Sequence, residues 1–291
     1  MENEVNLSKG RKMRKVTLFL GFLYICLYSP TAFGLDIMGP PATDLEYGQL
    51  KFGLDYSYSQ VDLELNNGRY ITYLDGWIDE AGSEHSYSLK NVKVRKFYAY
   101  FGYGLAYNLE SFIRVGGANA RFGDSAFSPE FWPGGEDFDS HTDFSVGFGL
   151  KGTFYEEENV KFGGLFQVNR SEFDGAIQPA DWPVADDYVE MGITEIQIAV
   201  GMTCKLSESF SVYGGPFLHF IDGQWDDVYS EITTEAPYQL RTSKYSWDIE
   251  EDSIGVYLGA NLNLAENSGL NVEYQHTSAV DVIGLNLVWK Y

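Results

Sequence analysis

The stretch Phe144-Ser145-Val146-Gly147-Phe148-Gly149-Leu150-Lys151 alternates large apolar residues with small or polar ones. A period of two is typical of a β-strand with one apolar and one polar face. The same alternation recurs along residues 50–57, 194–202, 254–262 and 283–291. It predicts an all-β fold with about ten strands, at residues 47–63, 91–107, 112–122, 143–154, 160–170, 192–204, 210–221, 252–264, 269–277 and 281–291.

The lengths of the predicted strands and of their connections point to a membrane. Most of the strands are long enough for the roughly 9–11 residues that cross a bilayer, whereas strands in soluble proteins average about 5–6. Tight turns at 108–111, 155–159, 206–209 and 265–269 alternate with long connections at 64–90, 123–142, 171–191 and 222–251, and a short one lies near 278–280. This layout predicts an antiparallel transmembrane β-barrel with short periplasmic turns and long outer loops. A secreted sandwich or soluble calyx would explain the alternation but not this asymmetry.

The N-terminus is predicted to be an export signal. A basic run at 9–15 precedes an uncharged apolar stretch, and Ala32-Phe33-Gly34 offers small residues for cleavage after Gly34. Because about 20 uncharged residues could just span a bilayer, a retained anchor is the alternative. We therefore expect a signal peptide at 1–34, a short periplasmic lead-in at 35–46 and the barrel at 47–291.

Composition excludes several classes of protein. The formal net charge is −22, which argues against nucleic-acid binding, and an aromatic content of 16% argues against a disordered acidic chain. Of two cysteines, Cys26 lies in the predicted signal peptide, so Cys204 is left without an internal disulfide partner.

The chain ends on a strand, VIGLNLVWKY, with an aromatic last residue. Together with the export signal, the alternating strands and the alternating turn lengths, this ending resembles single-chain bacterial outer-membrane β-barrel proteins, OmpA-like or OmpX-like in the general sense. The resemblance implies insertion into the outer membrane of a diderm bacterium, with Trp289 and Tyr291 as the assembly signal read by the barrel-assembly machinery. The family commonly ends in Phe, where this chain has Tyr291. Outer-membrane lipids are the expected surroundings, and the family implies no fixed activity.

The faces predicted to line the barrel carry many glycines and charges of both signs, including Lys51, Asp55, Lys151, Glu195 and Glu273. Mixed signs suggest internal ion pairs, and ten strands enclose a narrow lumen, so we expect a largely occluded interior. A narrow, cation-preferring pore is the alternative, because glycine gives up side-chain volume. In 112–122 an internal repeat aligns Phe112 and Phe122 with lipid-facing residues, which would point Arg114 outward.

Negative charge is concentrated in the predicted outer loops, and its plainest interpretation is a solvated surface. Asp137, Asp139 and Asp143 stand two or four residues apart, and carboxylate oxygens suit Ca²⁺ or Mg²⁺, so these residues form a possible metal site. The segment lacks the glycine and the distal glutamate of an EF-hand loop. No other cofactor is expected.

Five tryptophans fall in or beside the predicted loops, namely Trp77, Trp132, Trp182, Trp225 and Trp247, and the last four are the candidate binding residues. A membrane-interface belt is the usual explanation for them, and binding of a sugar or a protein by exposed loop aromatics is the functional alternative.

Asp139 and His141 are two residues apart, so on an extended strand the carboxylate could orient the imidazole. Ten-stranded surface proteases of the omptin family use Asp and His groups above the barrel rim, but their motifs are not matched here. We therefore expect a non-enzymatic protein with a structural or surface-interaction role through its acidic, aromatic-rich loops. A cation-preferring pore is the second hypothesis, and an omptin-like hydrolase is the third.

Overall fold

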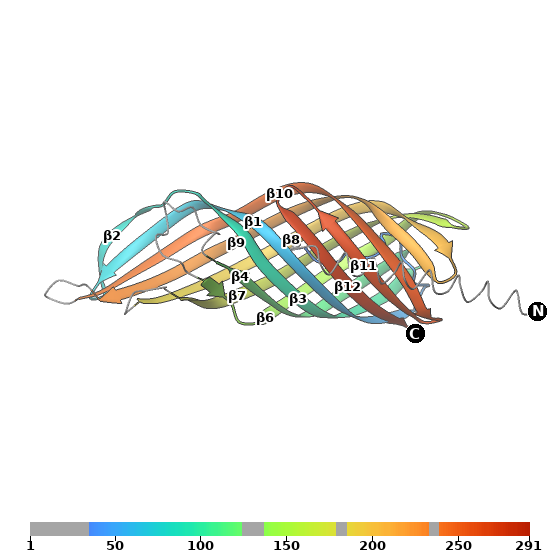
Figure 1. The fold of residues 1–291 in the computed structure, drawn as a ribbon, viewed down its shortest axis with the longest axis horizontal. Helices are drawn as coiled ribbons and strands as arrows, with labels where there is room; N and C mark the ends of the chain where they lie inside the picture. The colour runs from blue at the N-terminus through green and yellow to red at the C-terminus, as the bar shows by residue number, and fades with distance from the viewer. Residues whose placement is uncertain (1–34, 124–136, 179–184, 233–238) are drawn as a thin grey trace, which may run out of the picture.

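The computed structural model describes residues 35–123, 137–178, 185–232 and 239–291. These residues form twelve antiparallel strands in one sheet (Figure 1). The strands are β1 (Leu50–Leu74), β2 (Trp77–Ser83), β3 (Tyr87–Ala106), β4 (Leu109–Phe122), β5 (Asp137–Asp139), β6 (Asp143–Glu157), β7 (Val160–Gln178), β8 (Ala185–Ser207), β9 (Phe210–Ile232), β10 (Leu240–Ala265), β11 (Ser268–His276) and β12 (Val280–Lys290). Among the described residues, no helix is long and apolar enough to cross a bilayer.

Ten of the strands close into a barrel. The order around the ring is β1-β3-β4-β6-β7-β8-β9-β10-β11-β12, and β12 pairs with β1 from Lys51↔Lys290 to Val61↔Val280. These ten strands are the ten that the alternation predicts. The other two, β2 and β5, are short strands within segments that were predicted to be loops.

Beyond the tip of the β11–β12 hairpin the ring becomes narrower. There β10 pairs directly with β1, starting at Leu65↔Ile249, and β5 stands between β4 and β7 in place of β6. The ring thereby falls to eight strands, β1-β3-β4-β5-β7-β8-β9-β10. Much of the sequence predicted as outer loops therefore continues as strand and forms a long extension of the barrel, at the end opposite the C-terminus (Figure 1).

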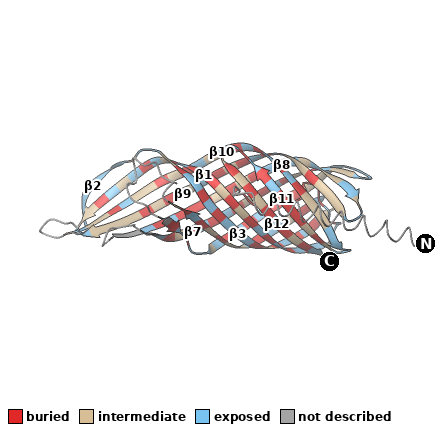
Figure 2. Cartoon of the chain, viewed as in Figure 1, coloured by how far each residue is buried: buried red, intermediate tan, exposed pale blue. Residues whose placement is uncertain are grey.

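The outward side chains of the ten-stranded part form an apolar band. Buried and exposed residues alternate along each strand (Figure 2). The band ends abruptly: on β10, Ile254 is followed by Asp252 on the same face, and on β9, Phe220 is followed by Asp222. From Leu264 to Ile254 the chain rises about 33 Å, which at a tilt of about 40° spans roughly 25 Å, the height of the apolar band of outer-membrane barrels.

The predicted orientation of 112–122 is wrong. Phe112 and Arg114 are both 2% exposed and point into the barrel, whereas Ile113 and Val115 point outward. Arg114 is held inside because its Nε lies 2.7 Å from Asp55 Oδ2 and its guanidinium lies 4.9 Å from the centre of the Phe112 ring. A buried counterion and an aromatic face satisfy this cation better than lipid would.

Candidate functional site: the plugged lumen

Most of the segment 35–46, which was predicted as a periplasmic lead-in, lies inside the barrel: residues 35–39, 41–43 and Leu45 are buried, whereas Asp44 and Glu46 are exposed. Leu35, Asp36, Ile37 and Met38 are each at most 2% exposed, and Leu45 is also buried. The segment has no strand pairing of its own and enters β1 only at Leu50. The described N-terminal residues thus form a plug, defined here as residues 35–46.

Polar wall residues hold the inner half of the plug through its backbone. Glu273 accepts hydrogen bonds of 2.8 Å from the amides of both Met38 and Gly39. Arg114 donates to the carbonyl of Ile37, and Gln275 donates to the carbonyl of Asp36 over 2.9 Å. A buried backbone without regular structure needs such partners, because unsatisfied amides and carbonyls are costly away from water.

Ion pairs anchor the plug at both of its ends. The Asp36 carboxylate lies 3.2 Å from Lys96 Nζ, which also pairs with Glu195. Near the other end, Asp44 lies 2.5 Å from Lys51 and 2.6 Å from Lys290. Ion pairs to wall residues on three strands, Lys96 on β3, Lys51 on β1 and Lys290 on β12, therefore determine where the segment lies.

Small wall residues make room for the plug. A Cβ added to Gly284 would come within 2.1 Å of Ile37 Cγ1, and one added to Gly104 would come within 2.0 Å of the Glu46 carbonyl oxygen. Both distances are shorter than any real contact, so only glycine fits beside the plug at these two positions. The interior glycines noted in the sequence are thus explained in part by the segment that they accommodate.

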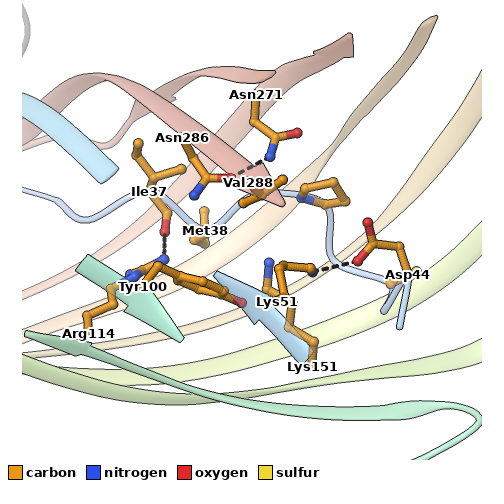
Figure 3. A pocket seen from close by; sticks show the side chains of 13 residues that line it. Ile37, Met38, Asp44, Lys51, Tyr100, Arg114, Lys151, Asn271, Asn286 and Val288 are labelled. Atoms are coloured by element: carbon orange, nitrogen blue, oxygen red, sulfur yellow. Dashed lines mark hydrogen bonds and ion pairs between the residues drawn. The ribbon is translucent and has the colours of Figure 1, made fainter. Parts of the chain in front are cut away.

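Little space remains between the plug and the wall. A cavity of about 20 Å³ is lined by residues that include Met38, Tyr100, Arg114, Lys151 and Asn286, which is room for about one water molecule. Figure 3 shows Lys51 reaching toward Asp44, and Arg114 pointing at Ile37, across this space. At this level the lumen is filled.

The eight-stranded extension has an apolar interior. Its buried residues, each at most 5% exposed, include Leu63, Leu89, Val92, Phe122, Phe138, Phe173, Met191, Ile221, Trp225, Trp247 and Ile249. The rings of Phe122 and Phe138 stack with centroids 4.7 Å apart, and Trp225 lies 5.6 Å from Phe122. A ring of eight strands encloses just enough space for side chains to fill. We call this set the apolar layer; it lies above the polar layer that holds the plug.

Of the four tryptophans predicted as binding residues of the outer loops, the structure describes two. Trp225 and Trp247 are directly paired on β9 and β10 and are 2% and 4% exposed, so they belong to the apolar layer and not to exposed loops. Sequence reasoning placed them in loops because the strands around them carry acids on their outer face. Trp132 and Trp182 lie outside the described residues.

Of the predicted metal ligands, Asp139 and Asp143 have other partners among the residues that the structure describes. Asp139 pairs with Arg121, whereas the Asp143 carboxylate accepts a hydrogen bond of 2.9 Å from the amide of Asp174. The side chain of Asp137 is outside the described set. Within that set, no three His, Cys, Asp or Glu side chains are grouped to hold a metal ion.

The suggested pairing of Asp139 with His141 is also not formed. His141 Nδ1 faces Asp174 Oδ2 at 3.4 Å instead, and the Asp139 carboxylate turns to Arg121. Asp139 and Arg121 face each other across β5 and β4, whereas His141 follows the end of β5 and faces β7. The two side chains therefore do not form the dyad that an omptin-like mechanism needs.

An open groove of about 480 Å³ lies on the outer surface across β6 to β9, and residues lining it include Asp143, Asp174, Tyr188 and Glu190. The Tyr188 hydroxyl donates a hydrogen bond of 2.7 Å to Asp174 and lowers the pKa of that carboxyl. Burial raises the pKa of Asp143. Acids outnumber bases among the residues that line the groove: Asp143, Glu172, Asp174, Glu190 and Asp226 against Arg170.

The residues predicted as the assembly signal lie where the barrel closes. Leu50 and Tyr291 exchange backbone hydrogen bonds of 3.0 and 2.9 Å, and the Tyr291 ring meets Phe52 edge-on at 5.8 Å. Trp289 and Tyr291 are 36% and 74% exposed on the lipid-facing side. Their role in assembly stays a prediction.

The closed ring and its apolar band decide the class of the protein. The chain is an integral outer-membrane β-barrel protein. It is similar in fold to the outer membrane protease OmpT of Escherichia coli, at 10% identity and a TM-score of 0.42, over 82% of this chain and 94% of that one. It is also similar to the transport unit of the autotransporter AIDA-I of Escherichia coli, at 12% identity and a TM-score of 0.44, over 89% and 93% of the two chains. No protein-family model and no curated sequence matches the chain.

Proposed function

We propose that this outer-membrane barrel is sealed and acts as a structural or surface-interaction element, not as a conduit. The proposal rests on one observation: the lumen is filled at two successive levels. The polar layer is occupied by residues 35–46, and the apolar layer above it is closed by side chains such as Phe122, Trp225 and Trp247. A path through the barrel would have to displace both.

The extension supplies a surface for interaction. Its far end exposes several large apolar side chains on adjacent strands: Ile71, Trp77, Ile78, Ile232 and Leu240. Trp77 is 80% exposed and Ile78 is 68% exposed, although both lie well beyond the apolar band. Exposed apolar side chains grouped away from a membrane are typical of protein contact sites. We infer that this tip, and not the lumen, makes the contacts through which the protein acts.

The wall charges do not favour the alternative of a cation-preferring pore. The buried wall cations are Lys51, Lys96, Arg114 and Lys151, and the buried wall anions are Asp55, Glu110, Glu195, Asp227 and Glu273. Cations and anions are thus interspersed among the described wall residues and do not form a ring of one charge, which is how a cation filter is usually built. Selectivity for cations would also need an open path through the apolar layer.

Conductance in a planar bilayer tests the proposal. The refolded full chain, verified by its heat-dependent shift on a gel, is expected to show no discrete current steps under a KCl gradient. Reproducible steps with a cation-selective reversal potential would contradict the sealed barrel and favour the pore. The orientation of the barrel in the membrane is tested separately. If the extension faces the outside of the cell, a membrane-impermeant maleimide should label the Trp77→Cys variant on intact cells.

A further inference from the structure

One sector of the barrel surface collects exposed cations. Lys93 of β3 lies directly opposite Arg121 of β4, and Arg95 lies two residues from Lys93 on the same outward face. All three residues are exposed. Facing side chains on paired strands are about 4.5–5.5 Å apart at Cβ, and diagonal neighbours about 7–8 Å, so the three charged groups can reach one small ligand.

Two of the three cations have no ion-pair partner among the described residues. Arg121 pairs with Asp139, but neither Lys93 nor Arg95 forms an ion pair within the described ranges. Like charges directly opposite on neighbouring strands are destabilising. Grouping them in a chain of net charge −22 is therefore unexpected unless an external anion compensates them.

The position of the cluster identifies that anion. Phe97, 53% exposed, lies two residues below Arg95 on the outward face of β3, and Val115, 40% exposed, is the first large apolar residue below Arg121 on β4, beyond Asn119 and Gly117. The apolar band ends at these two residues. The Arg95 guanidinium rests over the Tyr58 ring, 5.6 Å from its centre, which holds it at this level. Acyl chains of the outer leaflet end at the same height, so their headgroup phosphates lie beside these three cations.

We propose that Lys93, Arg95 and Arg121 form a binding site for the phosphate groups of a phosphorylated lipid of the outer leaflet. Arginine binds phosphate oxygens in a bidentate manner, and lysine adds a compact charge. The sector formed by β9 and β10 repels this ligand, because it presents Asp222, Asp252 and Glu250 beyond the end of the apolar band. The lipid would therefore bind on one side of the barrel rather than all around it.

Lipid retention tests the site. The full chain is refolded into phosphatidylcholine vesicles containing bis-phosphorylated lipid A, extracted in mild detergent, and analysed by native mass spectrometry. The triple variant Lys93→Gln, Arg95→Gln, Arg121→Gln should bind the lipid at least tenfold more weakly than the wild type. A second triple variant, Arg170→Gln, Lys205→Gln, Lys244→Gln, changes net charge equally at other exposed positions and should bind like the wild type. Both variants must first show the heat-dependent gel shift of a folded barrel, and Arg95→Gln alone serves if the triple variant does not fold.

Three results would overturn the site. The first is equal retention by the wild type and the Lys93, Arg95, Arg121 variant. The second is equal retention of dephosphorylated lipid A, which would show a contact with acyl chains only. The third is competition by the soluble, deacylated phosphorylated headgroup at the same concentration as the lipid, which would assign the cluster to a soluble anion.

Discussion

Adding a methyl group to the wall beside the plug should release the plug without opening the barrel. In Gly284→Ala the new Cβ would lie 2.1 Å from Ile37 Cγ1, and in Gly104→Ala it would lie 2.0 Å from the Glu46 carbonyl oxygen. Overpacking of this kind typically costs about 1–3 kcal/mol per site. The two changes together should therefore disfavour the seated plug by about 2–6 kcal/mol, a rise of about 30-fold to 10⁴-fold in the open fraction at about 1.4 kcal/mol per factor of ten.

Thiol labelling reads this opening directly. A reporter, Met38→Cys, is buried in the wild type, and replacing Cys26 and Cys204 by serine removes other thiols. The maleimide labelling rate in vesicles should follow the open fraction when closing is fast. The matched control is Gly152→Ala, whose added Cβ meets nothing closer than 3.7 Å and should leave the rate unchanged.

Two outcomes would refute the reasoning. If the variant carrying both Gly284→Ala and Gly104→Ala is labelled no faster than the control, the wall does not hold the plug as the structure describes. If this variant is labelled faster and also conducts ions, the apolar layer is not a seal and the sealed-barrel proposal fails. Faster labelling without conductance is the expected result.

Three further outcomes follow from the same structure. Trp225→Ala removes a 2% exposed ring from the apolar layer and should lower the free energy of unfolding by about 3–5 kcal/mol in guanidinium titrations; a loss below 1 kcal/mol would mean that the layer is loosely packed. Arg114→Met leaves Asp55 buried without its partner at 2.7 Å and should cost about 3–5 kcal/mol in the same assay, most of it recovered when Asp55→Asn is added; no recovery would show that the loss has another cause. Tyr188→Phe removes the hydrogen bond that lowers the pKa of Asp174, so this pKa should rise in an NMR titration of the carboxyl carbon, and an unchanged pKa would discount that bond.

The ten membrane strands were predictable because the bilayer imposes a local rule. Each strand must alternate between lipid and lumen, so Phe144, Phe148 and their equivalents show the orientation without any knowledge of neighbours. The rule fails where a face is ambiguous. At Phe112 and Arg114 both faces carry bulky residues, and only the counterion Asp55, contributed by β1, decides which one is inside.

Above the membrane the rule no longer applies, which is why the extension was predicted to be loops. With water outside, the outer face of β9 and β10 is acidic, and the acids around Trp225 and Trp247 concealed their alternation. Among the candidate site residues, the separation of Asp139 from His141 also depended on partners distant in sequence, Arg121 and Asp174.

The sequence by itself determined the class of fold, the number of membrane strands and which end carries the tight turns, because these depend on periodicity and spacing within each hairpin. Only the tertiary structure decided what fills the barrel. Residues 35–46 carry no pattern that assigns them to the lumen, and the contacts that hold them there, such as Met38 to Glu273, join positions 235 residues apart. Such contacts exist only after the strands have closed into a ring, since closure is what brings Glu273, Arg114 and Lys96 around one space.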